Sequence, residues 1–198
     1  ICYLTKPENT PIGAVQCDSF EMVRDSKKAY AKACRKQYDE QDEIYGRTIV
    51  QRHGNMMLVQ NPPQRSVTQE EFDYAYELPY MRTYHPMYEM DGGVPAITEV
   101  EFSITHNRGC FGFCNFCSIA LHQGRRVQTR SEDSVYNEAV MLSEKPNFKG
   151  YIHDVGGPTA NFRHPSCEKQ EEHGLCKGRK CLAPTPCKNI NADHSDYI

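Results

Sequence analysis

The stretch that decides the fold is residues 99–117, EVEFSITHNRGCFGFCNFC. Its first part alternates apolar and polar residues, with Val100, Phe102 and Ile104 on one face, which predicts a β-strand. The loop that follows holds three cysteines in a CxxxCxxC spacing: Cys110, Cys114 and Cys117. The stretch therefore predicts a strand whose end delivers three thiols within eight residues.

Three thiols on one short loop indicate a metal centre. They suit a cubane iron–sulfur cluster that keeps one iron open, because Cys thiolates are the usual ligands of such clusters. Structural zinc is the alternative and takes four ligands. His106, His122 or a later cysteine could supply the fourth. The spacing alone leaves iron–sulfur, zinc and metal-free cysteines open.

The residues after the loop predict one helix and a second strand. Ser131 is a candidate N-cap for a helix to about Glu144 that buries Val135, Ala139 and Leu142. A strand over 148–155 follows and ends at Gly156-Gly157-Pro158. Residues 98–157 therefore predict one βα unit and the next strand, because parallel strands need such a crossover.

The residues before the loop predict a separate α+β segment. An amphipathic helix is expected from residue 20 to about residue 41, with Cys34 in its apolar stripe. Two strands over 48–60 flank Gly54, which is a β-hairpin signal. A capping box over 68–71 starts a helix that runs to about Leu78.

Residues 79–88 are rich in aromatic residues and lack a clear period, which predicts a loop packed by its own rings. Asp91-Gly92-Gly93 and Pro95 read as a linker. We therefore expect a boundary that separates residues 1–95 from residues 96–198.

Composition narrows the function further. The 198 residues carry a formal net charge of -3, so the chain as a whole lacks the excess of positive charge that is typical of nucleic-acid-binding domains. No apolar run is long enough for a transmembrane helix, and no signal-peptide pattern is present. The first residue is Ile1, and Ser195 could cap a helix that is cut short, so we expect a fragment of a longer protein.

A second group of four cysteines lies in the C-terminal part of the chain: Cys167, Cys176, Cys181 and Cys187. These could hold a zinc ion or an auxiliary cluster, or be ordinary thiols. The spacing is irregular, and Glu168, Glu171 and Glu172 add negative charge, which slightly favours ordinary thiols. His122 and Arg125-Arg126, just past the loop, could face a substrate or the solvent.

These motifs resemble the radical S-adenosylmethionine (radical SAM) superfamily, and most closely its YgiQ-type proteins. Five stretches carry the resemblance: SITHNRGC at 103–110, LHQGR at 121–125, YIHDVGGPTAN at 151–161, YMRTYHP at 80–86 and QNPP at 60–63. The fold class that it implies is α/β: a fragment of a partial (β/α) radical SAM barrel. The fragment would hold the first βα unit and the second strand, after an α+β pre-barrel segment with a helix and a β-hairpin.

The resemblance also implies site residues. Cys110, Cys114 and Cys117 match the ligands of a 4Fe-4S cluster whose fourth iron binds S-adenosylmethionine. Phe116 matches the residue that meets the adenine. Gly156 and Gly157 match glycines whose backbone approaches the methionyl amino group, which a Cβ would hinder. Pro158 stands where many members carry Glu, which puts a side-chain contact there in doubt.

The implied activity is reductive cleavage of S-adenosylmethionine to a 5′-deoxyadenosyl radical that acts on an unknown substrate. The implied partner is an external electron donor of the flavodoxin or ferredoxin type. We expect the protein to act in the cytoplasm, and we expect neither a membrane nor a nucleic acid as a partner. The fragment alone is expected to be inactive and to self-associate. The rival hypothesis is a non-catalytic, zinc-binding interaction module.

Overall fold

The computed structural model describes residues 1–157, 162 and 167–190. The described residues form two compact units. The first unit comprises Ile1–Ser66, Phe111–Arg126 and residues 167–190. The second comprises Val67–Cys110 and residues 127–157 and 162. Each unit is described by itself.

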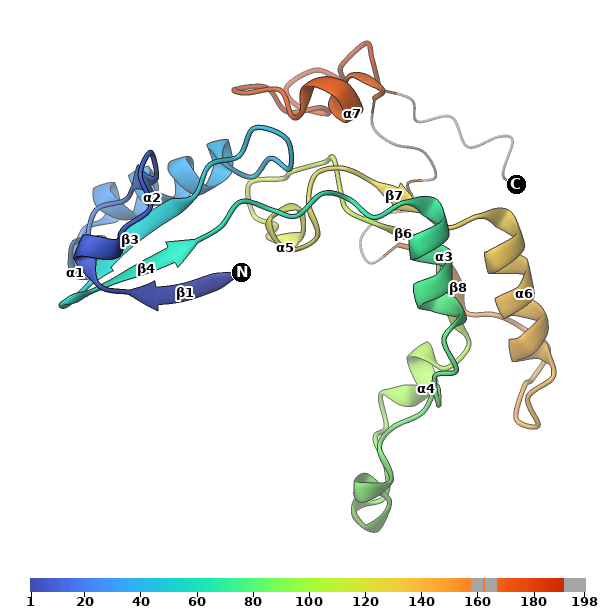
Figure 1. Cartoon of the computed structure of the whole chain (residues 1–198). Coiled ribbons are helices and arrows are strands. Elements are labelled where there is room, and N and C mark those ends of the chain that lie inside the picture. The colour runs from blue at the N-terminus through green and yellow to red at the C-terminus, as the bar shows by residue number, and fades with distance from the viewer. Residues whose placement is uncertain (158–161, 163–166, 191–198) are drawn as a thin grey trace. The chain divides into compact units, whose positions relative to one another are not determined.

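A four-stranded sheet is the framework of the first unit (Figure 1). Its order is β1 (Cys2–Thr5), β4 (Met56–Gln60), β3 (Ile49–His53) and β2 (Val15–Gln16). β4 pairs antiparallel with β1 and β3, whereas β2 runs parallel to β3. A short 3-10 helix, η1 (Pro7–Asn9), lies between β1 and β2. The predicted hairpin is confirmed, and Gly54 takes a φ of 57° in its turn.

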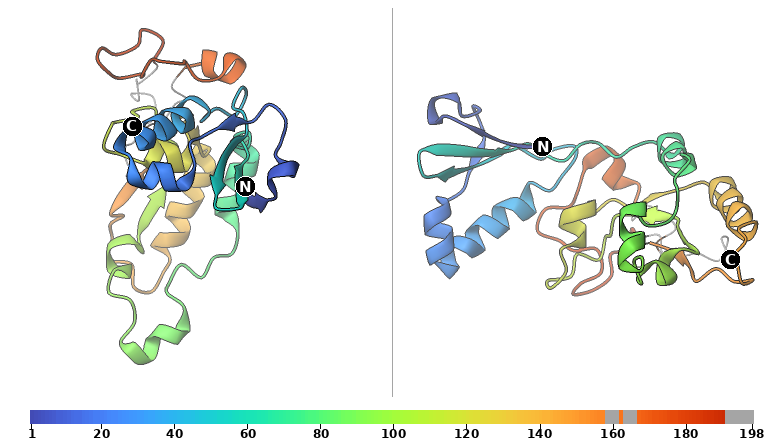
Figure 2. Two further views of the ribbon diagram at one scale, coloured as in Figure 1. Left: turned by 90° about the vertical axis from the view of Figure 1, so that its left-hand side faces the viewer. Right: turned by 90° about the horizontal axis from the view of Figure 1, so that it is seen from below.

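Two helices, rather than the single one predicted, cover one side of this sheet (Figure 2). They are α1 (Phe20–Asp25) and α2 (Lys27–Asp39). Ser26 separates them because its backbone is extended and its hydroxyl accepts the Ala29 N–H at 3.3 Å, which caps α2. A serine that caps a new helix ends the previous one.

The face that these helices bury also differs from the prediction. Ala29 and Ala33 are the buried residues of α2, and Ala33 packs with Cys17 and Ile49. Cys34 is exposed, so its place in an apolar stripe was wrong. The buried positions thus carry small alanine side chains, whereas the larger Tyr30 of α2 is 60% exposed.

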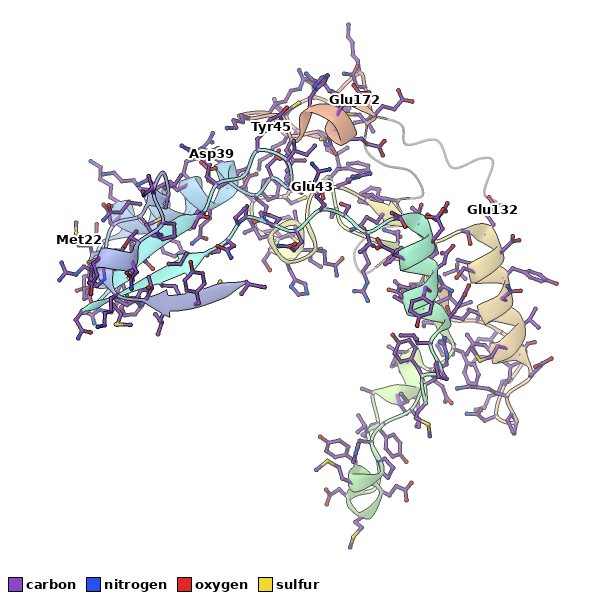
Figure 3. The ribbon with its side chains drawn as sticks, in the orientation of Figure 1. Met22, Asp39, Glu43, Tyr45, Glu132 and Glu172 are labelled. Atoms are coloured by element: carbon purple, nitrogen blue, oxygen red, sulfur yellow. The ribbon has the colours of Figure 1, made fainter. Side chains whose placement is uncertain are left out.

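Side-chain contacts tie two short helices, α5 (Ile119–Gln123) and α7 (Lys169–His173), to the rest of the first unit. Gln41 donates from Nε2 to the Leu121 carbonyl at 3.0 Å, beside α5. Arg126 pairs with Glu43 at 2.9 Å and with Glu171 of α7 at 3.0 Å. Figure 3 labels Glu43 on the segment after α2. Three segments far apart in sequence therefore meet in one unit.

The second unit contains the predicted βα arrangement. β5 (Ser103–Thr105) and β8 (Asp154–Gly156) pair in parallel, and α6 (Glu132–Ser143) lies between them in the chain. Ser131 caps α6, as predicted, by accepting the Ser134 N–H at 3.1 Å. The core consists of buried residues from these elements: Phe102, Ile104, Val135 and Leu142. One βα unit and the following strand are confirmed, and the complete barrel stays a prediction.

Both strands are shorter than predicted. Residues 97–100 form a helical turn, α4 (Ile97–Val100), and Val100 is 59% exposed. The second strand begins at Asp154 rather than at residue 148. Phe148 still packs against the core from outside the strand. Phe102, Ile104 and Phe148 were therefore assigned to the correct core, whereas Val100 was not.

A helix and a small ribbon complete this unit. α3 (Gln69–Glu77) begins with the predicted capping box, in which Thr68 accepts the Glu71 N–H at 3.2 Å and Glu71 accepts the Thr68 N–H at 2.9 Å. α3 runs beside α6 (Figure 1). An antiparallel pair, β6 (Asn107–Arg108) and β7 (Gln128–Thr129), was not predicted.

The aromatic loop does not pack on its own rings. Tyr80 and Tyr88 are exposed, as are Met81 and Met87, and the loop ends in the 3-10 helix η2 (Pro86–Asp91). Residues 67–95 belong to the same unit as β5. The boundary at residue 95 concerns the domains of the whole protein and stays a prediction. No helix in the described residues is long and apolar enough to cross a membrane.

Candidate functional site

The cysteine loop runs from the end of β6 to the start of α5. Gly109 turns the chain after β6 with a φ of 87°, a left-handed conformation that favours glycine. Phe111 and Phe113 are then only 1% and 3% exposed, whereas Phe116 is 93% exposed. Two buried rings therefore anchor the loop, and the ring predicted to meet the adenine is open to a ligand.

Phe113 is held from two sides within the first unit. Its ring stacks on Tyr38 of α2, with ring centroids 3.7 Å apart, and the Arg125 guanidinium lies 4.6 Å from the ring centroid. Phe113 has a φ of 47°, which is uncommon for a bulky residue and costs energy. This strain is located immediately before Cys114, so packing fixes the backbone between the first and second loop cysteines.

The three loop cysteines are free thiols. Cys117 donates its N–H to the Cys114 carbonyl at 3.1 Å, so these two share one tight turn of the first unit. Cys114 is exposed and Cys117 is half-buried. Cys110 is half-buried and ends a segment of the second unit.

The donor set fits an iron–sulfur cluster in its chemistry. Three free thiols lie on one anchored loop, and two of them share a turn. No group of three Cys, His, Asp or Glu side chains that could hold a metal ion occurs within the described residues. The ligand set that the sequence predicts therefore stays a prediction.

The predicted glycine turn follows β8. Gly156 pairs with Thr105, and its carbonyl accepts the His106 N–H at 2.9 Å. A Cβ added at Gly157 would lie 2.4 Å from both Oδ1 and Nδ2 of Asn107, a side chain with 0% exposure. The absence of a side chain at residue 157 thus has a packing cause that the sequence did not reveal. Pro158 lies outside the described residues.

A buried charge network at the end of β5 was missed by the sequence analysis. Arg130 is 0% exposed, donates to the Thr105 carbonyl at 3.0 Å and pairs with Glu138. Its guanidinium lies 4.5 Å from the Tyr76 ring centroid, and Glu138 also pairs with Arg82. The only available signal was the four-residue spacing of Arg130, Ser134 and Glu138. The network joins α3 and α6 to β5.

The second cysteine group also consists of free thiols. Gln170 donates from Nε2 to the Cys181 sulfur at 3.6 Å. Burial raises the pKa of Cys181, and the nearby Arg125 opposes the increase. The preference for ordinary thiols in this group stays a prediction.

Comparisons with known proteins place the chain in a family. The family model described as Radical SAM N-terminal matches residues 1–103. A UPF0313 protein from Clostridium botulinum (strain 657 / Type Ba4) is 57% identical over 184 residues, which are 93% of this chain and 29% of the relative. A second, from Clostridium botulinum (strain ATCC 19397 / Type A), is 54% identical over 196 residues, 99% of this chain and 30% of the relative.

A UPF0313 protein from Clostridium perfringens (strain 13 / Type A) is 52% identical over 180 residues, 91% of this chain and 27% of the relative. The chain thus spans less than a third of the length of these curated relatives. No solved structure matches. The family match covers more than half of the chain and agrees with the resemblance seen in the sequence. The chain therefore belongs to the radical SAM N-terminal family.

Proposed function

We propose that the protein is a radical SAM enzyme that carries a 4Fe-4S cluster and acts on a substrate not yet known. The observation that carries this proposal is a CxxxCxxC loop of free thiols, anchored by buried rings, in a chain of the radical SAM N-terminal family. When bound, the cluster would supply the electron that cleaves S-adenosylmethionine to a 5′-deoxyadenosyl radical.

The chain's own residues would hold and orient these groups. Cys110, Cys114 and Cys117 would be the thiolate ligands. The backbone hydrogen bond from Cys117 to Cys114 holds two of these residues in one turn. The stacked Tyr38 and Phe113 rings restrict the loop, which reduces the entropy lost when it closes around a metal. The exposed Phe116 ring is available to stack on the adenine.

Several parts of this proposal concern the whole protein. An external donor of the flavodoxin or ferredoxin type would reduce the cluster, and the protein would act in the cytoplasm. The Gly156-Gly157 backbone would approach the cofactor's methionyl group. The present chain alone would be inactive and could self-associate.

The test is metal loading of single variants of the full-length protein. Cys110→Ala, Cys114→Ala and Cys117→Ala should each lose the cluster after anaerobic reconstitution, because each removes one of its three protein ligands. Cys34→Ala is the matched control, since Cys34 is an exposed thiol on α2, outside the loop. Full iron content in a loop variant would exclude that cysteine as a ligand. Colourless protein with stoichiometric zinc would instead support the interaction module.

A further inference from the structure

A cavity of about 330 Å³ lies within the first unit, between α2, the cysteine loop and the segment that follows α7. Its walls carry five cationic side chains: Arg35, Arg125, Lys177, Arg179 and Lys180. Only two carboxylates line it, Asp39 and Asp42. Figure 3 labels Asp39, at the end of α2. The lining therefore has a clear excess of positive charge.

Both carboxylates are already engaged. Asp39 pairs with Arg35 at 2.9 Å. Asp42 accepts the N–H groups of Ile44 at 2.7 Å and Tyr45 at 2.8 Å, and its second oxygen accepts the N–H of Leu175. Within the described residues, none of the other four cations of the cavity forms an ion pair with a carboxylate. Lys180 donates to Asn115 Oδ1, and Lys177 is near enough to Glu40 to help lower the pKa of that carboxyl.

Arg125 is the most deeply buried of these four cations. It is 4% exposed, donates from Nη2 to the Arg179 carbonyl at 3.2 Å and lies over the Phe113 ring. Its Nε is buried and makes no hydrogen bond in the described part of the chain, and the same holds for the Tyr38 hydroxyl. A buried charge is costly unless it is paired. An anion bound in the cavity would compensate the charge of Arg125.

We propose that this cavity binds a phosphate group of a small phosphorylated molecule. A phosphate monoester brings close to two negative charges and three acceptor oxygens, which matches a lining with several cations better than the single charge of a carboxylate does. The volume is in the range of small-molecule sites. Asn115, between Cys114 and Cys117, also lines the cavity, so the ligand would contact the cysteine loop. The proposal does not depend on the radical chemistry.

The test is binding of inorganic phosphate to the full chain, measured by equilibrium dialysis against acetate at equal ionic strength. We expect one saturable phosphate site per chain and no comparable acetate site. Lys177→Gln/Lys180→Gln should weaken phosphate binding about ten- to hundredfold, because it removes two charge-assisted contacts. Lys169→Gln/Lys188→Gln is the matched control, since it makes the same charge change in the same segment outside the cavity.

The test substitutes lysines rather than Arg125, because loss of Arg125 would also disturb the packing of Phe113. An unchanged phosphate affinity in the cavity variant, or an equal loss in the control, would overturn the proposal. Equal binding of acetate, or no saturable phosphate binding to the wild-type chain, would overturn it as well.

Discussion

Replacing Gly157 with alanine tests the link between the glycine turn and the strand before the cysteine loop. The added Cβ would lie 2.4 Å from two atoms of Asn107 and 2.7 Å from its Cγ. Real Cβ atoms do not approach other atoms so closely, and Asn107 has 0% exposure, so the buried side chain must move. Overpacking of this kind costs about 1–3 kcal/mol.

For a chain of this size, that cost corresponds to a decrease in Tm of about 2–12 °C. Calorimetry of Gly157→Ala should detect it in the transition of the second unit. The control is the same substitution in an Asn107→Ala background, where the three nearest atoms are absent. The two changes should couple by about 0.5–3 kcal/mol, because they act on one contact. Additive effects would refute this account of the glycine.

The same pair of variants separates packing from cofactor binding. If the Gly157 backbone approaches S-adenosylmethionine, the double variant should regain stability but still bind the cofactor more weakly than Asn107→Ala does. Calorimetric titration of cluster-loaded, full-length protein measures this difference. Equal affinities would leave Asn107 packing as the sole reason for glycine and contradict the cofactor assignment.

Three further predictions concern the thiols and the carboxylates. Burial raises the pKa of both Cys17 and Cys181, so iodoacetamide at pH 8 should alkylate them more slowly than the exposed Cys34, as peptide mass spectrometry can follow; equal rates would contradict it. Hydrogen bonds from Arg47 lower the pKa of Glu40 below its ordinary value of 4.5. The stabilisation from ionised Glu40 should therefore be fully present above 4.5 and be lost as the pH falls from there through the lowered pKa of the folded state. Arg47→Gln should therefore flatten the acid limb of a Tm-against-pH curve, and an unchanged limb would exclude the pair as a contributor. A variant without the three loop cysteines should contain no metal, because the sequence favours ordinary thiols in the second group, and one bound zinc ion or cluster would reverse that preference.

Local signals explain which elements the sequence predicted. Gly54 in a two-strand pattern, the capping box at Thr68 and the cap at Ser131 each act within a few residues, and all three were confirmed. The same locality explains an error at Ser26, where a cap competes with helix continuation and a periodic pattern does not reveal the outcome.

Features that depend on contacts distant in sequence were not predictable. Arg130 is buried because Thr105, Tyr76 and Glu138 surround it, and these come from three different elements or their ends. The close contact of Gly157 with Asn107 likewise joins the ends of two strands. The cysteine loop was recognisable from its spacing as a candidate metal centre. The cation-lined cavity was not recognisable, because its lining comes from three separate segments.

The central claim is that the loop cysteines bind an iron–sulfur cluster, and metal analysis tests it most directly. Iron and acid-labile sulfide are counted per chain after anaerobic reconstitution of the full-length wild-type protein and of the Cys114→Ala variant. The account predicts a brown wild-type protein with about four iron atoms and about four sulfides in this centre. It predicts that Cys114→Ala loses this centre. A colourless wild-type protein with zinc, or equal iron content in both proteins, would contradict the account.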